Sequence, residues 1–194
     1  MVSFLAAEDR GYPAEAAIIE SRRRRLADFE ALYFDNVDFV RRVVARMLGT
    51  ARADVDDAVQ EVFLIALRKR HSFEGRAEPS TWLCAIARRI ALSARRRARL
   101  RTFLGLEVAA DLPDARTPLA SFENREAAKE LYALLDQLGE KKRTVFILHE
   151  LEGLSGEAIA QIVGCPLKTV WTRLFHARRE LARLAGEATE RSNP

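Results

Sequence analysis

Cysteine is scarce in this chain of 194 residues, which contains only Cys84 and Cys165. Because the two stand far apart and alone, they exclude a disulfide framework and a Cys-x-x-Cys zinc site within the chain. The three histidines are equally scattered, whereas catalytic or metal-binding histidines need partners close by. The sequence also lacks a glycine-rich phosphate loop and a nucleophile elbow. We therefore expect no metal, no cofactor and no enzymatic activity.

Long hydrophobic runs are absent as well. The longest stretch without a charged residue is ten positions, residues 158–167, whereas a membrane-spanning helix needs about twenty apolar residues. The N-terminus carries Glu8 and Asp9 and lacks the basic start and apolar core of a secretory signal. We expect a chain that does not insert into a membrane and that is located in the cytoplasm.

Charged residues are plentiful and unevenly distributed. Hydrophobic residues make up 48% and charged residues 31% of the chain, a balance that favours a folded protein over a disordered one. Residues 86–101 contain seven arginines and no acid, whereas residues 54–61 contain four acids and no base. Acids outnumber bases nine to six in residues 107–150, and bases outnumber acids five to one in residues 168–183. Two basic stretches therefore flank an acidic middle.

Lysine is rare among the basic residues. Only five of the 32 are lysine, which leaves 27 arginines. The planar guanidinium makes bidentate contacts with phosphate and guanine that lysine cannot make. A solvated helix face is the simpler interpretation of any single arginine run. Two unpaired basic runs in one chain instead favour nucleic acid as a partner.

Helical periodicity accounts for most of the chain. Apolar residues recur every three or four positions in residues 26–47, 59–67, 81–94 and 131–181, the spacing of one helical face. Convincing strand-like alternation is absent, so we predict an all-α fold of two small helical domains joined by a flexible linker. The predicted parts are an N-terminal extension (1–25), a first domain (26–100), a linker (101–122), a second domain (123–186) and a C-terminal tail (187–194).

Capping signals locate several helix ends in the first domain. Gly49 closes the first helix or helix pair, and Asp54 or Asp56 caps the next. The stretch 71–80 contains glycine and proline and is expected to form a loop. A further helix is predicted from Thr81 to about residue 99, with its arginines pointing outward.

Residues 155–181 have the spacing of a helix-turn-helix. A short helix from about Gly156 to Val163 is followed by Gly164, which suits a left-handed helix end, and by Pro166, which suits a first helical position. So short a turn makes the two helices cross steeply. A recognition helix reads base edges with its N-terminal residues and contacts phosphates with flanking bases. The residues that the second helix leaves outward for this role are Lys168, Thr169, Trp171, Thr172, Arg173, His176 and Arg178.

Three blocks occur in the order DDAVQEVFLIALRKRHSFEG, STWLCAIARRIALSARRR and ELEGLSGEAIAQIVGCPLKTVWTRLFHARREL. Together they resemble the extracytoplasmic-function (ECF, group IV) sigma factors of bacterial RNA polymerase over roughly residues 26–185. The resemblance implies two helical domains. The first would melt and read the minus-10 promoter element, and the second would read the minus-35 element.

The resemblance implies roles for particular residues in the first domain. The acidic helix is similar to the segment that docks on the polymerase, and exposed acids give complementarity to a basic partner. Helix capping is the alternative role for the first two acids. The docking candidates are Asp56, Asp57, Gln60 and Glu61. The following loop and helix resemble the minus-10 reader, which holds an unstacked base and tracks the freed strand. The minus-10 candidates are Phe73, Glu74, Arg76, Ser80, Arg88, Arg89, Arg95 and Arg96.

The resemblance also implies partners. These are core RNA polymerase, through its β′ clamp helices and β flap, promoter DNA and an anti-sigma factor. The free protein is expected to be monomeric, with DNA binding masked until polymerase is bound or the anti-sigma factor is released. The chain departs from the family where Arg89 replaces a common asparagine, Ser93 a common aspartate and Trp171 a common lysine or small polar residue.

Two other classes of function remain open from the sequence. A helix-turn-helix regulator would form a stable homodimer and bind a palindromic site without polymerase, because symmetric half-sites mirror a two-fold protein. An adaptor of the transcription machinery, or an anti-sigma factor, would carry merely solvated basic helices. The segregation of acids and arginines on successive helices favours the sigma factor, because a dimer interface needs no such separation.

Overall fold

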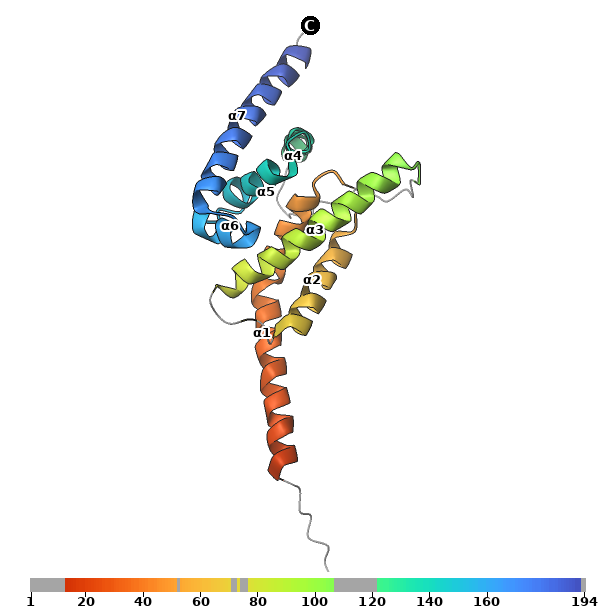
Figure 1. The fold of residues 1–194 in the computed structure, drawn as a ribbon. Helices are drawn as coiled ribbons and strands as arrows, with labels where there is room; N and C mark the ends of the chain where they lie inside the picture. The colour runs from red at the N-terminus through yellow and green to blue at the C-terminus, as the bar shows by residue number, and fades with distance from the viewer. Residues whose placement is uncertain (1–12, 52, 71–72, 74–76, 107–121, 193–194) are drawn as a thin grey trace, which may run out of the picture. The chain divides into compact units, whose positions relative to one another are not determined.

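The computed structural model describes residues 13–51, 53–70, 73, 77–106 and 122–192, with side chains described from residue 28 onward except within 122–126 and 189–192. This part of the chain is helical and contains no strand, which confirms the predicted all-α fold (Figure 1). None of its helices combines the length and hydropathy of a membrane span. The elements are α1 (Pro13–Leu48), α2 (Val55–Lys69), α3 (Pro79–Phe103), α4 (Phe122–Leu135), α5 (Glu140–Phe146), the π-helical turn η2 (Ile147–Leu151), α6 (Gly156–Val163) and α7 (Leu167–Ser192).

The chain divides into two compact units, residues 1–36 and 37–194. In the first unit α1 begins at Pro13, well before the helix start expected at Leu26. Residues 14–25 are rich in alanine, glutamate and arginine, which favour a helix, so no helix end marks the boundary predicted at residue 25. In the second unit the predicted apolar face of α1 is buried. It comprises Val40, Val43, Val44 and Met47.

The acidic motif starts α2, as the sequence predicts. The carboxylate of Asp54 accepts hydrogen bonds from the backbone N–H groups of Asp56 (2.8 Å) and Asp57 (3.0 Å). Asp54, rather than Asp56, is therefore the cap, and the two following acids lie at the positive end of the helix dipole. The apolar face of α2 packs against α3. Its buried residues are Ala58, Val59, Val62, Phe63 and Ala66.

The helix α3 is longer at both ends than the sequence predicts. It begins at Pro79 rather than Thr81. Proline is tolerated at a first helical position because its missing N–H would have no partner there. The helix also continues to Phe103, so the predicted linker loses residues 101–103 to α3.

The inward face of α3 differs from the predicted one in one important respect. Leu83 and Ile90 are buried as expected, and Ile86 is half-buried. Arg95, expected to point outward with the other arginines, is only 5% exposed. Cys84 is buried beside them, and burial raises the pKa of its thiol to about 12. The reactive thiolate is therefore strongly disfavoured at Cys84.

The C-terminal helices pack on each other and on α3. Residues 107–121 of the predicted linker lie outside the described residues. Beyond them, α5 and α6 both pack against α7, and α6 also packs against α3. The π-helical turn η2 continues directly from α5 and buries Ile147 and Leu148. The sequence predicts only a helical apolar spacing there, so the wider turn is a new finding.

The helix-turn-helix forms as predicted from α6 and α7. The hydroxyl of Ser155 accepts a hydrogen bond from the N–H of Ala158 and caps α6. Gly164 ends α6 with a left-handed φ of 66°, and its N–H donates to the Ala160 carbonyl at 2.9 Å. Pro166 precedes α7, which starts at Leu167 and continues to Ser192. The predicted C-terminal tail is therefore helical through residue 192.

Gly156 allows the recognition helix α7 to approach α6 closely. A Cβ atom on Gly156 would lie 2.6 Å from Cζ2 of Trp171 and 2.8 Å from Cδ1 of Leu167. The rings of His149 and Trp171 also meet edge-on, with their centroids 5.5 Å apart. Gly156 supplies the space that the Trp171 ring needs.

We expect Gly156→Ala to destabilise the protein by about 1 to 3 kcal/mol, because the added methyl would force the Trp171 ring out of its position. Thermal unfolding followed by circular dichroism and Trp fluorescence measures the effect. The control is Gly186→Ala in the exposed part of α7, where a Cβ meets nothing within 4 Å and alanine favours the helix by up to about 1 kcal/mol. Equal stability of the two variants would contradict this account.

Candidate nucleic-acid and polymerase interface

The acidic face of α2 is exposed. Asp56, Asp57, Gln60 and Glu61 all lie at the surface, as docking on another protein requires. The carboxylate of Asp56 forms an exposed ion pair with Arg41 of α1. Residues three and four apart share one helical face, so Asp57, Gln60 and Glu61 form a contiguous polar patch.

The loop before α3 brings two aromatic rings together. The rings of Phe73 and Trp82 are 5.1 Å apart between centroids, with both side chains half-buried. Ser80 lies in the first turn of α3 and is also half-buried. Two further predicted loop residues, Glu74 and Arg76, lie outside the described residues.

The four predicted strand-contacting arginines of α3 have three different environments. Arg89 and Arg96 are exposed, Arg88 is half-buried and Arg95 is buried. Burial lowers the pKa of Arg88, nearby Glu140 opposes this shift, and Arg89 and Arg173 add to it. Arg88 of α3 and Arg173 of α7, assigned to different promoter elements, are thus within electrostatic reach of each other.

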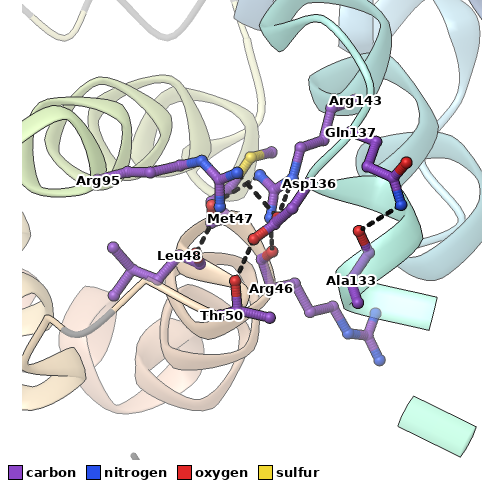
Figure 2. A network of polar contacts seen from close by, with 9 residues as sticks. All are labelled: Arg46, Met47, Leu48, Thr50, Arg95, Ala133, Asp136, Gln137 and Arg143. Atoms are coloured by element: carbon purple, nitrogen blue, oxygen red, sulfur yellow. Dashed lines mark hydrogen bonds and ion pairs between the residues drawn. The ribbon is translucent and has the colours of Figure 1, made fainter. Parts of the chain in front are cut away.

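Arg95 belongs to a buried polar cluster at the end of α1 (Figure 2). Its Nη1 donates a hydrogen bond to the Leu48 carbonyl (2.8 Å), and its Nη2 forms an ion pair with Oδ1 of Asp136 (2.8 Å). Arg143 of α5 contacts the same Oδ1 through Nε at 3.2 Å. One carboxylate oxygen therefore faces two guanidinium groups.

The guanidinium groups of this cluster also cap α1. Arg143 donates through Nη1 to the Met47 carbonyl (2.7 Å) and through Nη2 to the Arg46 carbonyl (3.1 Å). The last carbonyls of a helix have no partner within it, and here arginines of α3 and α5 supply the donors. The Thr50 hydroxyl donates to Oδ2 of Asp136. We refer to the side chains of Arg95, Asp136 and Arg143 with the carbonyls of Arg46, Met47 and Leu48 as the Asp136 cluster.

A second ion pair lies close to the end of α1. Nη1 of Arg46 is 2.9 Å from Oε1 of Glu152, and the same guanidinium donates to the Leu151 carbonyl. Burial raises the pKa of Glu152, whereas Arg46 and Arg42 oppose that shift. The sequence predicts no role for Asp136, Arg143 or Glu152.

The predicted recognition residues of α7 are mostly accessible. Lys168, Trp171, Thr172, His176 and Arg178 are exposed, whereas Thr169 and Arg173 are half-buried. Several already have partners within the protein. The Thr172 hydroxyl donates to the Lys168 carbonyl (2.9 Å), and Nη1 of Arg173 lies 3.5 Å from Sγ of Cys165.

Arg178 forms an ion pair with Glu150 of the π-helical turn η2. Its Nε donates to Oε1 of Glu150 at 2.9 Å. Burial alone would raise the pKa of Glu150, but hydrogen bonds from Arg178 and His149 lower it. The carboxylate therefore stays ionised and holds Arg178 beside η2.

A basic groove of about 850 Å³ runs along α7 beside α5. Its lining includes three bases that the sequence analysis did not single out, Lys142, Arg179 and Arg183, with Thr172, Arg173, His176 and Glu180. The three- and four-residue spacing of 172, 176, 179 and 183 could have indicated this shared face. No group of metal-ligating side chains occurs in the described part of the chain.

Two protein families match the two helical halves. Residues 32–101 match the family described as Sigma-70 region 2, and residues 128–181 match Sigma-70, region 4. The first match covers the second half of α1 with α2 and α3. The second covers the helix-turn-helix and the helices before it.

Curated relatives agree in sequence over about two thirds of the chain. The chain is 37% identical over 137 residues to the ECF RNA polymerase sigma-E factor of Haemophilus influenzae, a match covering 66% of this chain and 72% of that protein. It is 34% identical over 148 residues to the RNA polymerase sigma-H factor of Pseudomonas aeruginosa, covering 72% and 76%.

Solved structures agree in fold. The sigma factor RpoE of Bartonella quintana, solved in complex with the anti-sigma factor NepR, superposes with a TM-score of 0.65 at 24% identity, covering 82% of this chain and 97% of that one. CnrH, solved with the cytosolic domain of CnrY, gives 0.61 at 23% identity, covering 82% and 88%. With both region matches in family order and relatives above 30% identity, the chain belongs to the ECF sigma factors of RNA polymerase.

Proposed function

We propose that this sigma factor binds core RNA polymerase through α2 and reads promoter DNA through α3 and α7. The observation that carries the proposal is the separation of exposed charge, with acids on α2 and arginines on α3 and α7. A basic protein surface complements the acids of α2, and DNA phosphates complement the arginines of α3 and α7. A homodimeric regulator would need no exposed acidic helix of this kind.

The surface of this protein that docks on polymerase is the patch formed by Asp57, Gln60 and Glu61, with Asp56 at its edge. Supporting this assignment, all four side chains are exposed although the opposite face of α2 is buried. The β′ clamp helices of polymerase are the proposed partner. The β flap is the proposed partner of the C-terminal helices.

The minus-10 surface comprises the loop before α3 and the arginines of that helix. Phe73 and Trp82 offer a half-exposed aromatic pair, and aromatic rings stack on unpaired bases. Glu74, Arg76 and Ser80 complete the proposed base-binding loop. Arg89 and Arg96 lie seven residues apart and therefore on one face of α3, where we propose that they contact the DNA backbone. Arg88 lies between that face and the core.

The minus-35 surface comprises the first three turns of α7. Lys168, Thr169, Thr172, Arg173 and His176 lie where a recognition helix meets base edges and phosphates. Trp171 is held by its packing on Gly156, so it contacts DNA only through its exposed edge. Arg178 is proposed as a phosphate contact whose guanidinium is oriented by Glu150.

We further propose that an anti-sigma factor controls this chain, since RpoE, of similar fold, was solved in complex with one. The free protein is proposed to be monomeric and to act in the cytoplasm, where polymerase and DNA are found. Core polymerase and an anti-sigma factor would compete for the same helices.

Run-off transcription from a randomised promoter library tests the proposed function. With core polymerase of the encoding organism, we expect transcripts that require this protein and share two upstream sequence blocks. Core polymerase alone is the control. Absence of such transcripts, with a dimer of the protein shifting duplex DNA without polymerase, would instead support the regulator.

We expect Glu61→Arg to weaken binding to core polymerase at least tenfold, about 1.4 kcal/mol, because it places a like charge against a basic partner. Surface plasmon resonance on immobilised core measures the affinity. Asp35→Arg, an exposed reversal on α1, is the matched control and should bind normally. Circular dichroism should show both variants folded; unchanged affinity of Glu61→Arg would exclude this docking site.

We expect Arg173→Ala to weaken binding to minus-35 DNA by about 1 to 3 kcal/mol if the guanidinium reads a base, with sequence preference relaxed at one position. A phosphate contact would instead weaken all sequences alike and reduce the salt dependence. Competition binding with a set of single-base variants distinguishes the two. An unchanged affinity for every sequence would remove Arg173 from the interface.

A further inference from the structure

Large apolar side chains are exposed at the C-terminal end of α3. Phe103 is 85% exposed, the most of any large apolar residue in the described part of the chain. Three leucines accompany it, each more than half exposed: Leu100, Leu104 and Leu106. Burial of such side chains is favourable, and single exposed ones need no explanation. Four within seven residues instead mark a surface that binds a partner.

This end of α3 has a closed, hydrogen-bonded geometry. Gly105 adopts a left-handed φ of 67°, and its N–H donates to the Thr102 carbonyl at 3.1 Å. The N–H of Leu106 donates to the Arg101 carbonyl at 3.0 Å. These two bonds form a Schellman motif, which satisfies carbonyls that the end of a helix leaves without partners. Phe103 therefore lies on a capped helix end and is held at the surface.

Leu100 and Phe103 continue the exposed arginine face of α3. With Arg89 and Arg96 they fall within about 60° of one another, on a helix that turns about 100° per residue. All four side chains are exposed, whereas Ala98 on the opposite face is buried. Phe103 lies about 10 Å beyond Arg96, at about 1.5 Å per residue. A DNA strand that follows the two arginines therefore reaches Phe103 next.

Basic side chains surround the exposed apolar group. Arg97, Arg99 and Arg101 are exposed beside it, and residues 86–106 contain no acid. Single-stranded DNA matches both parts of this surface, because aromatic side chains stack on its bases and arginines contact its phosphates. Apolar side chains also insert at base steps that lose their stacking. Continuity with the arginine face makes an opened promoter strand the partner that this surface fits.

We propose that Phe103, flanked by Leu100 and Leu104, stacks on the base at the edge of the promoter segment that is opened. This inference rests on the proposed function, because it takes the arginines of α3 as contacts to the minus-10 strand. A base at that edge loses one stacked neighbour when the duplex opens. The Phe103 ring replaces this neighbour and thereby stabilises the open complex.

Phe103→Leu in the holoenzyme tests this inference, because it keeps an apolar side chain and removes the aromatic ring. One readout is the lifetime of the open complex on a promoter selected by run-off transcription. The other is the fluorescence of 2-aminopurine, which is brighter when unstacked, placed in turn at each non-template position of the minus-10 element. We expect the lifetime to shorten at least fivefold and the fluorescence to rise at one position. Phe103→Trp should restore both.

Phe34→Leu is the matched control, because Phe34 is also largely exposed (73%) but lies on α1. It should change neither readout, and circular dichroism should show every variant folded. Wild-type lifetime for Phe103→Leu would overturn the inference, as would a shortened lifetime without a fluorescence change at any position.

An effect of Phe103→Leu confined to the affinity for core polymerase would also overturn the inference, because the end of α3 would then dock on protein. Transcription by the wild-type holoenzyme is measured in parallel. Failure of the proposed function would appear as loss of these wild-type transcripts, whereas failure of the stacking inference would leave them intact.

Discussion

The second compact unit depends on one carboxylate oxygen, Oδ1 of Asp136, shared by the guanidinium groups of Arg95 and Arg143. Asp136 follows the C-terminal end of α4, where the helix dipole disfavours a negative charge by about 0.3 to 1 kcal/mol. Burial lowers the pKa of Arg143 to about 10, a shift that Asp136 opposes, so the arginine is charged at neutral pH. Breaking such a buried pair costs about 3 to 5 kcal/mol, whereas exposed pairs contribute at most about 1.

The same side-chain chemistry serves the fold and the function. Arginine forms planar, bidentate contacts equally well with carboxylates and with phosphates, so a DNA-binding surface rich in arginine is also a surface that acids of the same chain can cover. On α3, Arg89 and Arg96 are exposed, while Arg95 is buried against Asp136. Neighbouring arginines of one run thus differ in burial, because some are exposed to solvent and one lies in the interior.

Several features of the fold and site were predictable because they depend on neighbouring residues. The cap at Asp54, the left-handed Gly164 and the exposed acids of α2 follow from short-range hydrogen bonding and helical spacing. The early start of α1 at Pro13, the wide turn η2 and the long α3 were not predicted. Residues 14–25 favour a helix by composition rather than by apolar periodicity, so a prediction based on periodicity missed the start of α1. Spacing alone placed Trp171 on the outward face of α7, and its close contact with Gly156 is seen only in the tertiary structure.

The sequence by itself determined the helical class, the helix-turn-helix and the separation of acidic from basic helices, since periodicity, capping and charge order are read along the chain. Tertiary structure decided which arginines are free. Arg95 and Arg143 donate to carbonyls 47 and 96 residues away, and no local pattern encodes partners at such separations. A charged residue on a helix has the same sequence signature whether it faces water or a buried acid, and only the packing of the helices distinguishes the two.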